Sequence, residues 1–400
     1  MKKGTWARLL PALLLVLAPF VEGCGNFWQA PGSSSGGGNT GTTLSSGVFY
    51  VLNQTTRQIV AYSISSGSLT TIGTYSLTTA PYAIAIAPSN GFLYVSTVGG
   101  IYLYTINSST GGLTVGNQGS AISTDIAQAL AVDTKGVWLV DAVTGTSGVT
   151  FNAISITSSG MLNSNVEESQ AFAVTNAAVQ KMAISGDDAY VFVALGEGGT
   201  LIDPFTSGNT NPLGSQASTI PTVTSLASAL SVAVDPGSSP RLFYIGETEA
   251  SSGSGGLRAF EYSSLGGSSL TELAGSPYSA GGTAPAAILP EAAGKYVYVA
   301  SGTGTTSNGV IQGFNIATST TGSTTTYTLS SISTVSTGIL PQGLAEDSLG
   351  NFVLAVSSGG SYDLEAYIFD TTTVGKLDTS ITSTTGTDPT GAWAVAAQAP

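Results

Sequence analysis

Residues 82–95 of the 400-residue chain read YAIAIAPSNGFLYV, with an apolar run on either side of the polar turn Pro88-Ser89-Asn90-Gly91. Short apolar runs bounded by Gly, Pro and Asn indicate buried β-strands joined by a tight turn. The pattern recurs at spacings of 46 to 58 residues, centred on Ala85, Ala131, Ala183, Ala233, Ala287, Ala345 and Ala394. A period of about 40 to 50 residues built only from strand and turn signals is typical of β-propellers. The sequence therefore predicts an all-β fold, a seven-bladed β-propeller.

The two ends of the repeat region predict how the ring closes. Residues 391–396 (GAWAVA) have the pattern of an inner strand, but the chain ends at Pro400 before any outer strand follows. Residues 48–51 (VFYV) have the pattern of a second strand with no inner strand before them. Together these runs make one blade shared between the N- and C-terminal strands, which protects the strand edges at the junction. This split favours a closed ring over a linear solenoid.

The composition supports one large β domain over residues 47–400. Charged residues make up only 8% of the chain, so the strong helix formers Glu, Lys and Arg are scarce. No long stretch beyond the N-terminus has apolar residues at helical spacing. The inner-strand runs are apolar at most positions, as expected for blades that pack against neighbours on both faces.

The N-terminus has the features of an export signal. Lys2, Lys3 and Arg8 accompany an apolar run over residues 9–21, which is shorter than the roughly 20 residues of a membrane span. A positive start, a short apolar run and then small residues are typical of a secretory signal peptide. We therefore expect residues 1–23 to be removed on export.

Cys24, the only cysteine, follows this signal directly, so an intrachain disulfide is excluded. Residues 21–24 (VEGC) resemble the cleavage box of bacterial lipoproteins, in which the cysteine is lipidated. We therefore expect a lipid anchor at Cys24, followed by a flexible Gly/Ser-rich linker over residues 24–46. The alternative is an ordinary cleaved signal with an incidental cysteine.

The mature chain is strongly acidic. Removing residues 1–23 takes away three of the 10 basic residues and one of the 23 acidic residues, which leaves 7 against 22 and a net charge of −15. Such a field repels nucleic acid and anionic lipid headgroups. We therefore expect no nucleic-acid partner, and a membrane association only through the lipid anchor.

The outer half of each repeat carries a family resemblance. Residues 59–64 (IVAYSI) are followed by Gly67-Ser68-Leu69-Thr70, and residues 101–106 (IYLYTI) by Gly112-Leu113-Thr114. With residues 49–54 (FYVLNQ), the pattern resembles the lactonase-type seven-bladed β-propellers with Tyr-Val-Thr-Asn-like (YVTN) repeats, the 6-phosphogluconolactonase-like family. The resemblance covers residues 47–400.

This resemblance implies a propeller fold and, for some members, hydrolysis of 6-phosphogluconolactone in the cytoplasm at a site that uses His with Arg and carboxylates. The chain has no His, so the fold carries over and that part of the site does not. An exported protein does not meet a cytoplasmic sugar phosphate, and a phosphorylated substrate favours paired cations. We therefore expect no 6-phosphogluconolactonase activity above the spontaneous rate.

The absence of His also excludes a Ser-His-Asp triad and any imidazole metal site. Residues 32–36 (GSSSG) match a nucleophile-elbow pattern, but they lie in the linker without a strand before them or a helix after them. Asp187-Asp188 is typical of a turn between two strands, and the chain has no calcium-binding loop of the EF-hand type. We expect neither a metal nor a cofactor.

The loops of the predicted channel mouth hold the candidate ligand-binding residues. Function concentrates in loops on a rigid scaffold, and propellers bind ligands on the face whose loops enter the inner strands and join the second and third strands. The candidates in these loops are Arg57, Asp125, Asp141, Lys181, Glu197, Glu247, Gln342 and Asp363, accompanied by Asn53, Gln128, Glu249 and Asp388. The pair Glu247 and Glu249 suits acid–base work, although two Glu in a Ser/Gly-rich loop are more often solvated.

These observations favour a monomeric, lipid-anchored propeller in the bacterial cell envelope, on its periplasmic or surface side, that binds an extracytoplasmic ligand or protein. The first alternative is a lactonase-like hydrolase that uses carboxylates at the channel mouth. The second is a structural module of a cell-surface complex. The enzyme requires carboxylates that converge on one pocket, so the placement of Asp125, Asp141, Glu197 and Glu247 distinguishes these hypotheses.

Overall fold

The computed structural model describes residues 47–65, 68–237, 242–248, 255–262, 270–321, 324–382 and 391–399. The predicted signal peptide (1–23), Cys24 and the linker (24–46) lie outside these residues, as do Glu249 and Asp388. The described chain consists of β-strands and one short 3-10 helix, η1 (Asn117–Gly119), which confirms the all-β prediction. Over these ranges, no helix is long and apolar enough to cross a membrane.

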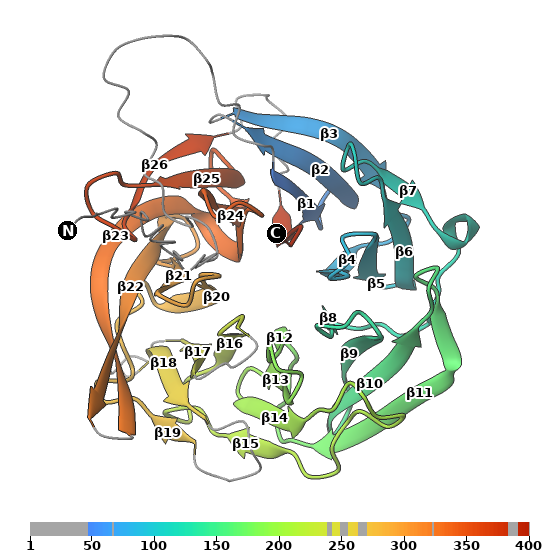
Figure 1. Ribbon diagram of the computed structural model, residues 1–400, viewed down its shortest axis with the longest axis horizontal. Coiled ribbons are helices and arrows are strands. Elements are labelled where there is room, and N and C mark those ends of the chain that lie inside the picture. Colours follow the sequence, from blue (N-terminus) through green and yellow to red (C-terminus); the bar gives the residue numbers. More distant parts are fainter. Residues whose placement is uncertain are drawn as a thin grey trace, which may run out of the picture.

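Six antiparallel sheets are found in the described part of the chain, and Figure 1 shows them arranged around a central axis. The first sheet joins β27 (Ala392–Ala397), β1 (Gly47–Asn53), β2 (Gln58–Ser65) and β3 (Ser68–Ser76) in that order. The second joins β4 (Pro81–Ile86), β5 (Phe92–Thr97), β6 (Gly100–Ile106) and β7 (Leu113–Val115). The third joins β8 (Ala129–Val132), β9 (Trp138–Thr144), β10 (Gly148–Ile156) and β11 (Leu162–Ala173).

The second half of the chain continues the series. The fourth sheet joins β12 (Lys181–Ile184), β13 (Tyr190–Ala194), β14 (Thr200–Pro204) and β15 (Ser218–Ile220), and the fifth joins β16 (Ala229–Val234), β17 (Leu242–Glu247), β18 (Gly256–Glu261) and β19 (Thr271–Glu272). The last joins β20 (Ala284–Pro290), β21 (Tyr296–Gly302), β22 (Asn308–Thr321), β23 (Thr324–Glu346), β24 (Phe352–Gly359), β25 (Leu364–Phe369) and β26 (Leu377–Thr382).

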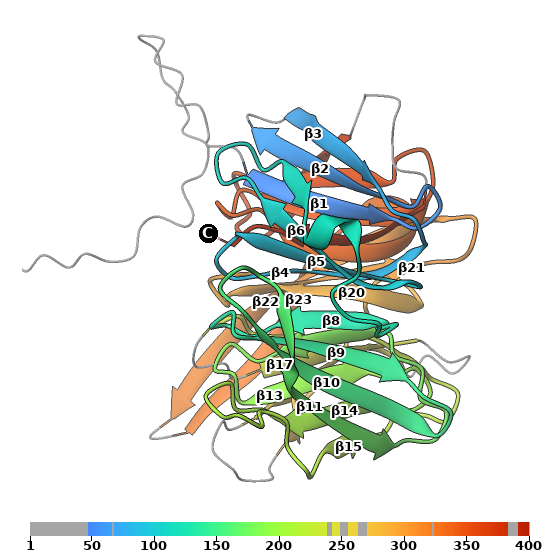
Figure 2. The ribbon, with the colours of Figure 1, turned by 90° about the vertical axis from the view of Figure 1, so that its right-hand side faces the viewer.

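The long strand β23 explains why the last sheet has seven strands. Its residues up to Ile339 pair with β22, and its residues from Ile339 to Glu346 pair with β24. One strand thus serves as the outer strand beside β22 and as the inner strand beside β24. Figure 2 shows the same sheets from the side.

The two ends of the described chain meet in one sheet. The strand β27 pairs with β1 from Phe49 opposite Ala397 to Asn53 opposite Ala392. On its other side, β1 pairs with β2 along its whole length. The C-terminal strand therefore lies inside the N-terminal strands, next to the axis.

The core lies between neighbouring sheets, and β1 shows how the sequence builds it. Phe49 and Val51 pack with Leu354 and its neighbours on one side, whereas Tyr50 packs with Leu93 and its neighbours on the other. Side chains of successive strand residues point to opposite faces. A strand packed on both faces therefore needs a continuous apolar run, which is the pattern seen in the sequence.

Tyrosines of second strands link neighbouring sheets. The Tyr94 hydroxyl donates a hydrogen bond to the carbonyl oxygen of Gly160, 2.9 Å away, in the turn between β10 and β11 of the next sheet. Gly160 has a φ of +79°, and a Cβ there would lie 2.4 Å from the Phe92 ring, so this close approach requires glycine. Equivalent hydrogen bonds join Tyr50 to Gly111 and Tyr298 to Gly375.

Candidate functional site at the mouth of the central channel

Two cavities that share lining residues lie among the strands nearest to the axis. The channel cavity, of about 230 Å³, is lined by parts of β4, β8, β12, β16, β20, β23 and β27 together with Gln128 and Gln180, which precede β8 and β12. The mouth pocket, of about 460 Å³, is lined by residues near the starts of β4, β8, β12, β16, β20 and β27, by the last residue of β21, and by Leu340, Pro341 and Gln342 of β23. Both cavities are lined by Tyr82, Gln128, Gln180, Lys181 and Gln342.

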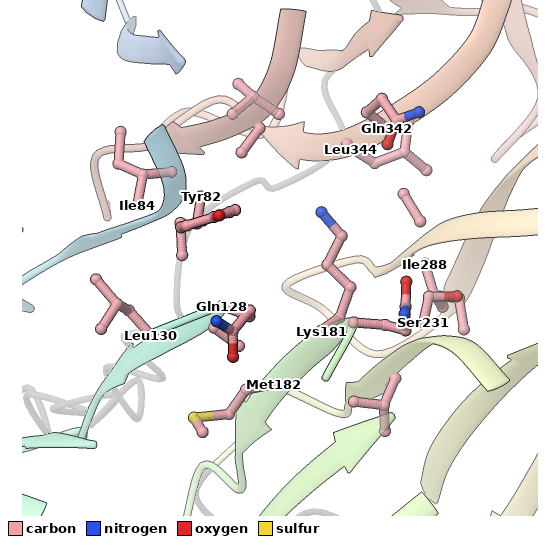
Figure 3. A pocket seen from close by; sticks show the side chains of 18 residues that line it. Tyr82, Ile84, Gln128, Leu130, Lys181, Met182, Ser231, Ile288, Gln342 and Leu344 are labelled. Carbon is pink, nitrogen blue, oxygen red and sulfur yellow. The ribbon is translucent and has the colours of Figure 1, made fainter. Parts of the chain in front are cut away.

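Lys181 is the charged residue of this site. Figure 3 shows its side chain extending from β12 into the open middle of the cavity, with Tyr82 on one side and Gln342 on the other. No hydrogen bond or ion pair reaches its ammonium group from the residues that the structure describes. Loss of hydration in the channel lowers the pKa of Lys181 to about 8. A fraction of the amine is therefore neutral near physiological pH.

Three glutamines surround the channel with the same local geometry. Gln128, Gln180 and Gln342 each donate a side-chain hydrogen bond to the backbone carbonyl oxygen two residues earlier, at 2.7, 3.2 and 3.3 Å. These bonds anchor the amides of Gln128 and Gln180 just before β8 and β12, and the amide of Gln342 within β23. The site therefore combines one cation with neutral groups that both donate and accept hydrogen bonds.

The repeat pattern itself contains a signal for Lys181. It stands two residues before the central alanine of its copy, and the same position holds Ala83, Ala129, Ser231, Pro285, Gly343 and Ala392 in the other six copies. A long charged side chain at a position that is otherwise small has room to reach the channel. Lys181 and Gln342, both predicted at the mouth, do line it, and Gln128 joins them. Tyr82, Gln180, Ser231 and Trp393 were not predicted to line these cavities.

Arg57 and Glu197, two of the predicted residues, lie outside both cavities. Arg57 is exposed in the turn between β1 and β2, with a φ of +54°. Glu197 is exposed after β13 and accepts a hydrogen bond from the Asn176 side chain, 3.2 Å away. Both residues are part of the solvated loop surface.

Glu247 does not lie at the mouth but in a buried ion pair between strands. Its Oε1 is 2.8 Å from Nη1 of Arg258, and its Oε2 accepts a hydrogen bond from the backbone N–H of Val223 at 2.8 Å. Arg258 also pairs with Glu272 at 2.8 Å. With both oxygens bound, Glu247 holds the segment before β16 in place and is not available for acid–base work.

Asp141 and Asp125 line neither the mouth pocket nor the channel cavity. Asp141 lies on β9 and is fully buried; its Oδ1 accepts a hydrogen bond from Asn152 at 2.9 Å, and its Oδ2 has no hydrogen-bond partner. Burial, and then the charge of Asp125, raise the pKa of Asp141 well above its usual range. Asp363 is also buried, and its backbone carbonyl accepts a hydrogen bond from Ser357.

The enzyme hypothesis required four carboxylates to converge on one pocket, and they do not. These are Asp125, Asp141, Glu197 and Glu247. In the described residues there is also no group of three or more acidic or cysteine side chains that could hold a metal ion. The chemistry of the mouth rests instead on Lys181 and its neutral neighbours.

Buried carboxyl groups predict that the protein becomes more stable as the pH falls from about 7 towards 5. Burial raises the pKa of Asp203 and of Glu346 to about 7, whereas unfolded carboxyl groups titrate near pH 4. Between these values the folded state binds more protons, so its stability decreases as the pH rises. We expect Asp203→Asn to raise the free energy of unfolding by about 2–3 kcal/mol more at pH 8 than at pH 5, because the pKa of Asp203 differs by about three units between the folded and unfolded states.

Urea unfolding at both pH values measures this effect. The exposed Asp378→Asn is the matched control, because it removes one charge from a solvated position. If the unfolding free energies of the wild type and Asp203→Asn differ equally at pH 5 and pH 8, the burial argument for Asp203 is wrong.

Solved structures of other proteins share the fold of this chain. No family model and no curated protein matches the sequence. Among solved structures, a protein from Bacteroides fragilis with a proposed 6-phosphogluconolactonase activity has a TM-score of 0.66 at 16% identity, covering 90% of this chain and 99% of that one. The periplasmic gluconolactonase of Pseudomonas aeruginosa has a TM-score of 0.64 at 16% identity, covering 89% and 99%. The chain has the fold of these β-propellers.

The predicted resemblance to lactonase-type propellers is thereby confirmed at the level of the fold. A third structure, from Bacteroides uniformis and also with a proposed 6-phosphogluconolactonase activity, has a TM-score of 0.64 at 17% identity over 83% of this chain. At these identities the propeller scaffold is shared, and the activity has to be argued from the site.

Proposed function

We propose that the protein is an extracytoplasmic β-propeller that hydrolyses a small, unphosphorylated lactone in the mouth pocket. The observation that carries this proposal is Lys181, an amine with no charged partner among the described residues and with a pKa of about 8, held among neutral amides on the axis. Support comes from the lactonase names of the structures that share the fold. In this proposal Lys181, and not a carboxylate at the channel mouth, acts as the general base.

In the proposed reaction, the neutral amine of Lys181 accepts a proton from a water molecule as the water oxygen attacks the lactone carbonyl carbon. The tetrahedral intermediate then collapses, the ring C–O bond breaks, and the proton passes from Lys181 to the departing ring oxygen. The product is a hydroxy acid, and the amine is regenerated. A general base works best when its pKa is near the working pH, and burial brings Lys181 into that range.

The charge of the site supports an unphosphorylated substrate. Lys181 is the only Lys or Arg among the residues described as lining either cavity. A phosphate group favours two or more cationic partners or a bidentate guanidinium, whereas lactone and sugar hydroxyls match glutamine amides. D-Glucono-1,5-lactone is therefore the first substrate to assay, against 6-phosphogluconolactone as the comparison.

A second candidate function is the binding of a small polar ligand without catalysis. It is favoured by one observation: neither cavity has a carboxylate among its described lining residues, so Lys181 would work without a second acid or base. The two functions separate in one pair of measurements. A lactone that raises the melting temperature but is not hydrolysed faster than in buffer supports binding alone.

We also infer that the scaffold has seven blades in a closed ring. The inference counts the seven-stranded sheet as two blades that share β23, and it assigns β27 as the inner strand that closes the first sheet. The parts of seven inner strands around the channel cavity support this count.

The lipid anchor at Cys24 and a position in the cell envelope stay part of the proposal. The periplasmic location of the P. aeruginosa protein supports export. We expect mass spectrometry of the native N-terminus to find a diacylglyceryl or triacyl modification on Cys24, and Cys24→Ala to release the protein from membranes. A native protein with a free, unmodified Cys24 thiol contradicts the anchor.

A further inference from the structure

A second polar pocket lies on the same face of the propeller as the mouth pocket, but away from the axis. This rim pocket, of about 270 Å³, is bounded by the turns β21–β22 and β24–β25, which join second and third strands, and by the middle of β23. Its lining residues are Asn308, Ser336, Thr337, Gly338, Ser361, Tyr362, Glu365 and Ser380.

Glu365 is the fixed charged group of the rim pocket. Its side chain is largely buried, and Oε2 accepts hydrogen bonds from the Thr337 hydroxyl at 2.8 Å and the Gly338 backbone N–H at 3.0 Å. The hydroxyl of Tyr367 lies 2.7 Å from the same oxygen. These contacts all go to Oε2 and hold the carboxylate in place, whereas no hydrogen bond reaches Oε1 from the described residues, so Oε1 can accept one from a ligand.

Tyr362 presents an aromatic surface at the edge of the pocket. It is 42% exposed, although the backbone beneath it is tightly held. The backbone N–H of Ser357 donates to the carbonyl oxygen of Asp363, and Gly338 approaches so closely that a Cβ there would lie 2.7 Å from the Tyr362 carbonyl oxygen. A rigid backbone that displays a large aromatic side chain to solvent is typical of a binding surface.

The lining chemistry selects the class of ligand. No Lys or Arg is among the described residues that line the pocket, so a phosphate or carboxylate ligand would meet no cation from them and would be repelled by Glu365. One carboxylate is also too few for a calcium site. Serine and threonine hydroxyls, an Asn amide and a fixed acceptor match the hydroxyl groups of a sugar, and a tyrosine face packs against its C–H groups.

We propose that the rim pocket is a subsite for a neutral saccharide. The strand β23 leads from this pocket to the mouth: Thr337 lies in the rim pocket, and Gln342, five residues later, lines the mouth pocket. At about 3.3 Å per residue the two are at most about 17 Å apart. An oligosaccharide of a few units held at the rim is therefore long enough to extend to the mouth pocket. This subsite does not depend on lactone hydrolysis.

The test is binding of uncharged and charged oligosaccharides to the purified protein, on a glycan array and then by calorimetry with the best tetrasaccharide. We expect binding to at least one neutral glucan, galactan, mannan or xylan fragment, and none to oligogalacturonate of the same length. Tyr362→Ala should weaken this binding about tenfold, the equivalent of about 1.4 kcal/mol. Glu365→Gln should weaken it at least as much.

Controls separate the subsite from folding and from the mouth. Tyr362→Ala removes an exposed ring, so its melting temperature should equal that of the wild type, and Val374→Ala, 60% exposed outside the pocket, should leave the affinity unchanged. Lys181→Met should leave rim binding intact even where it abolishes lactone turnover. No binding to any neutral glycan, equal binding of oligogalacturonate, or an affinity unchanged in Tyr362→Ala would each overturn the proposal.

Discussion

Replacing Lys181 by methionine should lower the turnover of D-glucono-1,5-lactone by a factor of about 10² to 10⁴, the range that a positioned general base contributes. Methionine preserves much of the length of the side chain but cannot accept a proton. Because Lys181 is bound to no partner in the described structure, its removal leaves no buried charge unpaired. The folded state should therefore be unaffected, and the loss should fall on the rate rather than on stability.

The pH dependence identifies the role of the amine. Wild-type turnover, corrected for spontaneous hydrolysis, should rise with pH and level off with an apparent pKa of about 8, the value that burial gives Lys181. Lys181→Arg keeps a positive charge but stays protonated across this range. It should be as inactive as Lys181→Met if the amine acts as a base, and should retain activity if the charge only stabilises the oxyanion.

Lys135→Met is the matched control, because Lys135 is exposed and donates to Ser207, away from the channel. Its turnover should equal that of the wild type. Equal activity of Lys181→Met and the wild type would show that the mouth pocket is not the site of hydrolysis. If the wild type itself does not exceed the spontaneous rate, the lactonase proposal fails and the binding function remains.

The propeller fold could be predicted from the sequence because the same pattern, two apolar runs separated by a polar turn, occurs seven times. Residues 82–95 alone are an ambiguous apolar hairpin, but seven copies spaced 46 to 58 residues apart are compatible with few architectures. The predicted inner strand at residues 391–396 corresponds to β27, and the run at residues 48–51 lies within β1, its partner in the structure. Pairing in a sheet follows from hydrophobic pattern and register, both of which are visible in the sequence.

The site was harder to predict because position along the chain does not give the direction of a side chain. Asp141 and Glu247 were assigned to the mouth from the loops and strand ends near them. In the structure they lie on second strands, β9 and β17, one strand away from the axis, and both are buried among their neighbours. Lys181 and Gln342 belong to inner strands, where a side chain reaches the channel directly. Comparing equivalent positions among the repeats predicts the site better than the position of a residue in a loop does. In this comparison Lys181 stands out, because the other copies have short, uncharged residues at its position.

The strand β27 is expected to hold the ring together, so deleting residues 391–400 should have the largest effect on stability. It pairs with β1 in the first sheet, and Trp393 donates a hydrogen bond to the carbonyl oxygen of Tyr82 at the edge of the second. The backbone of Ala399 exchanges two hydrogen bonds of 2.9 Å with the Asn90 side chain. On its other side, Val395 lies close to Gly343 of β23.

Without this strand, the fully buried Tyr50, Val51 and Leu52 of β1 lose their cover along one edge, and their backbone groups lose their partners. The loss spans several backbone hydrogen bonds and two interfaces between sheets, and it is comparable with the roughly 5–15 kcal/mol that stabilises a domain. The truncated protein should therefore be insoluble or lack a cooperative melting transition. A synthetic peptide of residues 388–400 supplied during refolding should restore solubility, and the single change Trp393→Phe should cost only about 1 kcal/mol. A truncated protein that melts cooperatively within a few degrees of the full chain would show that β27 does not close the ring.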